Sequence, residues 1–144
     1  MPNPIVNSAT TVWQGDLPSG SGNVTLETSG AGTLQVNWKA RSEESGSSTT
    51  PEELIAGAYA ACLSMQFSNE LSENGTPPTQ LDTNAKVTFA VGSGITRIDL
   101  DVKGQVEGIA PDEFRRIATS AKENCPVSQA LASVPEINLN AELR

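Results

Sequence analysis

Apolar and polar residues alternate in several segments of this chain, as is typical of half-buried strands. The clearest segment is TLQVNWKAR, in which four apolar residues face one side, and it predicts a strand that ends at Arg41. Alternation or strand-favouring composition predicts further strands at 10–16, 22–30, 85–91, 98–102 and 137–143. A GSG turn separates the segments 85–91 and 98–102, which we therefore expect to pair as a hairpin.

Helical spacing of apolar residues predicts a long helix from Pro51 to about Asn74. Thr50 can cap this helix, proline suits its first position, and Glu53 completes a T-x-x-E capping box. The sequence NGTPP ends it. Its expected buried stripe repeats at i, i+4, i+7 and i+11, and consists of Leu54, Ala58, Ala61 and Met65.

A second helix is expected to begin at Pro111. Its apolar stripe consists of Phe114, Ile117, Ala118, Ala121 and Cys125. Pro126 cannot continue this helix but can open a new one, which would place Cys125 at a helix junction. The resulting order, β-β-β-α-β-β-α-α-β, predicts a single α+β domain over residues 1–144.

The charge balance narrows the range of partners. Nine Lys and Arg residues against seventeen Asp and Glu residues leave a net charge of −8. This charge argues against nucleic acid or an anionic membrane as the main partner, because both need a basic surface. No apolar run approaches the roughly 18 residues of a membrane span, and the first residues do not resemble a secretion signal, so we expect a cytoplasmic location.

The chain contains no histidine, which excludes Cys-His and Ser-His-Asp catalysis and His-ligated metals. Its two cysteines, Cys62 and Cys125, could be inert thiols, a structural disulfide or a redox pair. The missing secretion signal disfavours a structural disulfide. Cys62 lies in the middle of its expected helix, so a reactive thiolate there would need a nearby Arg or Lys, for which Arg41 is a candidate.

Two motifs resemble those of the OsmC/Ohr family of thiol-dependent peroxidases. TPEELIAGAYAACLSM is similar to the family's P-E-x-L helix with A-C, and AKENCPVSQAL to its C-P-V-S motif. VWQGD and KARSEE fit in the same order, so the resemblance covers nearly the whole chain. The Ohr branch carries its arginine nearer the N-terminus, where this chain has none before Arg41, so the resemblance favours the OsmC branch.

The resemblance implies an OsmC-like fold, with antiparallel sheets packed on a long central helix in an intertwined homodimer. It assigns Cys62 as the peroxidatic cysteine, Cys125 as the resolving cysteine, and Arg41 and Glu52 as the arginine and glutamate of the active site. It further implies organic hydroperoxides as substrates, with weaker activity on H2O2. A lipoyl-type dithiol is the implied reductant, and no cofactor is implied.

Helix geometry constrains this assignment. Glu52 and Cys62 are ten residues apart, about 15 Å along a regular helix and about 280° around it. They can meet only if the helix is broken or if Glu52 reaches Cys62 of a second subunit. The alternative to an enzyme is a noncatalytic stress protein that binds a lipid-like or other small ligand on the same fold.

Overall fold

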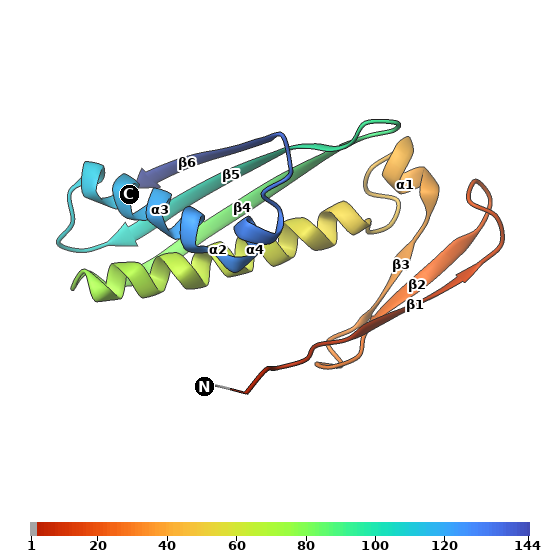
Figure 1. Ribbon diagram of the computed structural model, residues 1–144, viewed down its shortest axis with the longest axis horizontal. Helices are drawn as coiled ribbons and strands as arrows, with labels where there is room; N and C mark the ends of the chain where they lie inside the picture. Colours follow the sequence, from red (N-terminus) through yellow and green to blue (C-terminus); the bar gives the residue numbers. More distant parts are fainter. Residues whose placement is uncertain (1–2) are drawn as a thin grey trace. The chain divides into compact units, whose positions relative to one another are not determined.

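The computed structural model describes residues 3–144, and its chain divides into two units, Met1–Pro51 and Glu52–Arg144. The first unit contains an antiparallel sheet in the order β1-β2-β3, drawn in red to orange in Figure 1. Its strands are Ala9–Gln14, Ser21–Leu26 and Thr33–Val36. The three strands expected from the first third of the sequence are therefore present.

The prediction that the third strand continues to Arg41 is wrong. β3 ends at Val36, and the short helix α1 follows over Trp38–Ser42, so Arg41 lies on a helix. The side chain of Asn37 caps α1 by accepting a hydrogen bond of 2.8 Å from the backbone N–H of Ala40. Asparagine favours this cap over a continued strand because its carbonyl oxygen satisfies an amide that the helix leaves open.

The second unit follows the predicted order of elements; its helices begin where expected, whereas its first two strands are longer than the predicted 85–91 and 98–102. It consists of α2 (Pro51–Glu73), β4 (Pro78–Ala90), β5 (Gly94–Val106), α3 (Pro111–Asn124), α4 (Pro126–Ala130) and β6 (Glu136–Leu143). The three helices begin at the three prolines that the sequence indicated as starts. Within residues 3–144, no helix combines the length and apolarity that crossing a membrane requires.

The sheet of the second unit has the order β4-β5-β6 and is mixed. β4 and β5 form the expected antiparallel hairpin, whereas β5 and β6 run parallel, with Ile98 opposite Ile137. The expectation of purely antiparallel sheets is therefore wrong for β6. A parallel neighbour needs a long crossover connection, and α3 and α4 provide it between β5 and β6.

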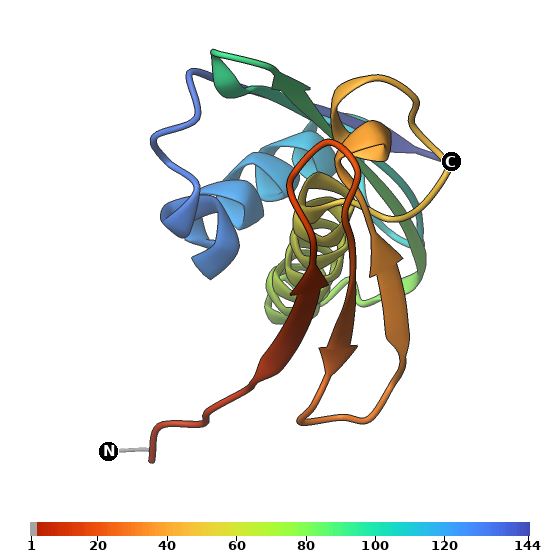
Figure 2. The same cartoon turned by 90° about the vertical axis from the view of Figure 1, so that its right-hand side faces the viewer.

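Helices α2 and α3 lie on the same face of this sheet (Figures 1 and 2). The core between them combines Tyr59, Leu63, Phe67 and Leu71 of α2, Ile98, Leu100 and Val102 of β5, and the predicted stripe of α3. The rings of Phe67 and Phe114 meet at a centroid distance of 4.9 Å. Gly104 makes room for this contact, because a Cβ there would lie 2.7 Å from the Phe114 ring.

The buried face of α2 differs from the predicted one. The structure buries Tyr59 and the apolar residues that follow it at intervals of four, whereas Ala58 and Ala61 are exposed and Met65 is 74% exposed. Both sets have helical spacing, so local pattern does not decide between them. The face with the larger side chains is buried because it removes more apolar area from water.

Candidate functional site

The two cysteines lie together in the second unit. Cys62 is in the middle of α2 and Cys125 is between α3 and α4, and their Sγ atoms are 2.8 Å apart. Both are free thiols; Cys125 is fully buried and Cys62 half-buried. The structure thus brings into contact two thiols that are 63 positions apart in the sequence.

The position of Cys125 follows from the proline after it. Pro126 disfavours helical geometry at the preceding residue, and Cys125 has an extended backbone with φ −68° and ψ 121°. Cys125 is therefore both the C-cap of α3 and the N-cap of α4, as the sequence indicated. The break in the helix at this point places its thiol against α2.

The surroundings of Cys62 favour the neutral thiol. Burial raises its pKa above the ordinary value of 9.0, and the contact with the Cys125 thiol raises it further. The backbone N–H of Val127 donates a hydrogen bond to Cys62 and acts in the opposite direction, but does not outweigh the other two effects. A positive group close to the sulfur is therefore required to form the thiolate near neutral pH.

Tyr59 connects this pair of thiols to α4. Its side chain is fully buried one turn before Cys62, and its hydroxyl forms a hydrogen bond with the hydroxyl of Ser128. Burial raises the pKa of Tyr59; the Ser128 hydrogen bond opposes this rise, and the two thiols add to it, so the phenol stays protonated. Sequence reasoning did not identify Ser128 or the amide of Val127. The available signal was that Tyr59 lies three residues before Cys62, which places both side chains on the same side of α2.

A pocket of about 470 Å³ extends from Cys62 along the exposed face of α2. Its lining is mostly apolar and consists of Ala58, Ala61, Cys62, Met65, Gln66, Asn69 and Pro126. Three of the four residues expected to form the buried stripe of α2, Ala58, Ala61 and Met65, therefore line a pocket beside the thiol instead. Such a surface suits the hydrocarbon part of a small molecule.

The structure places the other two predicted site residues as follows. Glu52 is buried in the first turn of α2, and α2 continues without a break from Pro51 to Glu73. An unbroken helix keeps Glu52 about 15 Å from Cys62 along its axis, so these side chains do not meet within one chain. Arg41 belongs to the first unit, and its position relative to the thiols stays a prediction.

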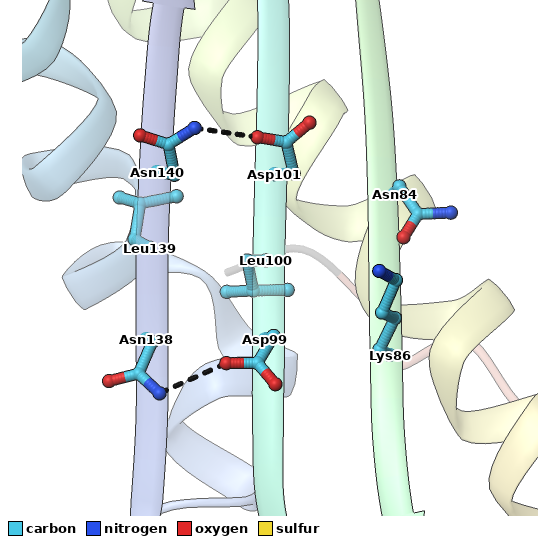
Figure 3. Close-up of a pocket in the computed structure, with 8 residues that line it drawn as sticks. All are labelled: Asn84, Lys86, Asp99, Leu100, Asp101, Asn138, Leu139 and Asn140. Carbon is cyan, nitrogen blue, oxygen red and sulfur yellow. Dashed lines mark hydrogen bonds between the residues drawn. The ribbon is translucent and has the colours of Figure 1, made fainter.

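A second, polar hollow of about 530 Å³ lies on the opposite face of the β4-β5-β6 sheet (Figure 3). Amide groups of β6 donate to carboxylates of β5 there, from Asn138 to Asp99 at 3.0 Å and from Asn140 to Asp101 at 2.8 Å. The hollow contains no thiol, and these cross-strand pairs join the amides of β6 to the carboxylates of β5. Within residues 3–144, no cluster of three or more Cys, Asp or Glu side chains could hold a metal ion.

Comparison with known proteins gives consistent matches. The family model described as OsmC-like protein matches residues 44–140. Peroxiredoxin OsmC of Escherichia coli (strain K12) is 40% identical over 136 residues, which covers 92% of both chains. Organic hydroperoxide resistance protein-like 1 of Staphylococcus epidermidis is 26% identical over 105 residues, covering 68% of this chain and 72% of the relative.

Solved structures share the fold. An organic hydroperoxide resistance protein from Elizabethkingia anophelis superposes with a TM-score of 0.75 at 20% identity, over the full length of both chains. An OsmC-like protein from Mycoplasma pneumoniae superposes with a TM-score of 0.73 at 16% identity, over 96% of this chain and 97% of the other. Together with the sequence matches, these likenesses show that the chain belongs to the OsmC-like protein family.

Proposed function

We propose that this protein is a thiol-dependent peroxidase that reduces organic hydroperoxides. The observation that carries the proposal is the pair of free thiols with sulfur atoms 2.8 Å apart beside an apolar pocket. The names of the relatives, a peroxiredoxin and organic hydroperoxide resistance proteins, support the same chemistry. A cytoplasmic location, where cellular reductants keep thiols reduced, agrees with this proposal.

The reaction uses the two cysteines in sequence. The Cys62 thiolate attacks the O–O bond of the hydroperoxide, an S–O bond forms, and the alkoxide leaves and takes up a proton as the alcohol. The Cys125 sulfur then attacks the Cys62 sulfenic acid, an S–S bond forms, and water leaves. An external dithiol, of the lipoyl type in our proposal, reduces this disulfide by exchange and is itself oxidised.

Arg41 and Glu52 complete the proposed site. The Cys62 thiol is neutral in its own surroundings, and a guanidinium beside it would lower its pKa and donate to the peroxide oxygens as charge develops. A carboxylate bound to that guanidinium would hold it in place, which is the role that we propose for Glu52.

The unbroken α2 supports a homodimeric site, because Glu52 could approach Cys62 only from a second subunit. The alanine-rich sequence of α2 also suits close approach of another helix. Light scattering tests the dimer. A monomeric mass for fully active protein would exclude it.

Turnover of cumene hydroperoxide and of H2O2 with dihydrolipoamide tests the function. The apolar pocket predicts faster turnover of the organic substrate. Cys62→Ser should abolish activity, and Cys125→Ser should stop turnover with the dithiol while still allowing Cys62 to be oxidised once. Full activity of Cys62→Ser would overturn the proposed mechanism.

The second candidate is a noncatalytic protein that binds a lipid-like ligand, which the apolar pocket favours. Dialysis with a radiolabelled fatty acid distinguishes the two. Tight binding that is unchanged in Cys62→Ser, together with no hydroperoxide turnover by the wild type, would favour this candidate.

A further inference from the structure

The short segment that carries Cys125 is attached to α2 through two pairs of side chains, in addition to the backbone N–H of Val127 that donates to Cys62. Tyr59 and Cys62 are three residues apart on α2, and their partners Ser128 and Cys125 are three residues apart in the opposite direction. One turn of α2 therefore contacts the segment 125–128 twice, through Tyr59 with Ser128 and through Cys62 with Cys125. A segment held at two points one turn apart cannot rotate about one contact without breaking the other.

We propose that Tyr59 and Ser128 form a positioning pair that holds Cys125 over Cys62 and thereby sets the rate and equilibrium of disulfide formation between them. This inference rests on the proposed function, because it assumes that the two thiols form a redox pair. Neither Tyr59 nor Ser128 touches the substrate in this proposal; both act through the segment Cys125–Ser128.

The weak attachment of α4 explains why a positioning contact matters here. The helix has five residues, and none of them is fully buried. Val127 and Leu131 pack against the core only in part, and the side-chain amide of Gln129 donates to the backbone carbonyl of Glu123 near the end of α3. The hydrogen bond to Tyr59 of α2 adds a fixed contact, on a side chain that is itself fully buried.

The chemistry of the pair suits a permanent contact. Burial keeps the Tyr59 hydroxyl protonated, because it raises the pKa of the phenol, so the hydrogen bond persists over the pH range in which thiols titrate. The sulfur atoms must approach from 2.8 Å to about 2.05 Å to form the disulfide. A prepositioned partner raises the effective concentration of Cys125 at Cys62 and so favours this step.

Loss of the contact has a defined chemical consequence. Cys125 would condense more slowly with the Cys62 sulfenic acid, so the sulfenic acid would persist longer. A second hydroperoxide molecule would then oxidise it to the sulfinic acid, with release of a second alcohol. The positioning pair therefore protects Cys62 from irreversible oxidation.

The test uses Tyr59→Phe and Ser128→Ala in the full-length protein. Tyr59→Phe keeps the buried ring, and Ser128 is half-buried, so either change removes the hydrogen bond with little change in volume. Thr83→Val is the matched control, because it removes another hydroxyl–hydroxyl contact of α2, the 2.7 Å bond from Ser64 to Thr83 on β4.

The first measurement is the thiol–disulfide equilibrium of Cys62 and Cys125 in dithiothreitol redox buffers. One lost hydrogen bond should lower the equilibrium constant for the disulfide about fivefold, which makes the reduction potential about 20 mV less negative at 29.6 mV per tenfold change. The second measurement is trapping of the sulfenic acid by dimedone after one equivalent of cumene hydroperoxide. We expect about fivefold more trapped Cys62 in both variants than in the wild type or Thr83→Val.

The double variant Tyr59→Phe/Ser128→Ala should show the same change as each single variant, because all three remove one interaction. Additive effects, or wild-type values for both single variants, would overturn the positioning role and leave the peroxidase proposal intact. If the wild type forms no disulfide between Cys62 and Cys125 with hydroperoxide, the proposed function itself fails. The potential does not depend on peroxide turnover, so the two failures are distinguishable.

Discussion

Replacement of Arg41 by methionine tests how the Cys62 thiolate arises. A thiol with a pKa of 9.0 is about 1% ionised at pH 7, and burial together with the Cys125 contact raises the pKa of Cys62 above 9.0. Without a cation, the thiolate fraction at pH 7 therefore lies below about 1%. If Arg41 lowers this pKa by one unit or more, its loss should slow the reactions of the thiolate at least about tenfold.

The assay is the rate of alkylation of Cys62 by iodoacetamide between pH 5 and 10, followed at the level of the peptide by mass spectrometry. Because only the thiolate reacts, the midpoint of the rate profile reports its pKa. We expect Arg41→Met to move this midpoint to higher pH and to lower the rate at pH 7 at least about tenfold.

Lys39→Met is the matched control. It removes a positive charge from the same short helix, two residues away, where Lys39 forms an exposed ion pair of 3.0 Å with Glu44. Its alkylation profile should match that of the wild type. An unchanged midpoint in Arg41→Met, in protein with wild-type circular dichroism, would refute the assignment of Arg41 to the thiol.

Three further predictions concern the core, the pH dependence of stability and the pocket. Gly104→Ala should lower the free energy of unfolding by about 1–3 kcal/mol in urea titrations, because its methyl group would lie 2.7 Å from the buried Phe114 ring; unchanged stability would contradict this packing. Burial raises the pKa of Glu70, but hydrogen bonds from Ser120 and two amide side chains outweigh it and hold the pKa below 4.5. The stability that this carboxylate contributes is therefore present above pH 4.5 and is lost as pH falls through the lowered pKa. Glu70→Gln should destabilise the protein at pH 7 and have less effect at pH 3. Urea midpoints measured at the two pH values check this. Met65→Asp should raise the KM for cumene hydroperoxide about tenfold and leave that for H2O2 nearly unchanged, since Met65 lines the pocket but is 74% exposed; equal effects on both substrates in steady-state assays would exclude binding of the organic group there.

Local sequence patterns determined the elements of the second unit. Pro51, Pro111 and Pro126 mark the starts of the three helices, because proline's fixed φ and missing N–H suit a first helical turn and little else within a helix. The hairpin of β4 and β5 follows from strict alternation around a glycine turn. Both cysteines could be proposed as a pair from the two motifs that contain them.

Local patterns failed where contacts outside the pattern decided the structure. The alternation through Trp38 and Ala40 indicated a strand, but the Asn37 side chain caps a helix there instead. The two apolar faces of α2 both have helical spacing, and the choice between them depends on the area that each buries against β5 and α3. The parallel direction of β6 follows from the connection through α3 and α4, which returns the chain to the start of β5, and the sequence of β6 alone does not indicate it.

The candidate site shows the same division. The sequence by itself determined that this chain, without histidine, must use its cysteines with an arginine or lysine if it performs thiol chemistry. Only the tertiary structure decided that Cys62 meets Cys125, that the Val127 amide points at the sulfur, and that Tyr59 bonds to Ser128. These contacts join residues more than 60 positions apart, and they form because Pro126 bends the chain at the place where α3 reaches the side of α2.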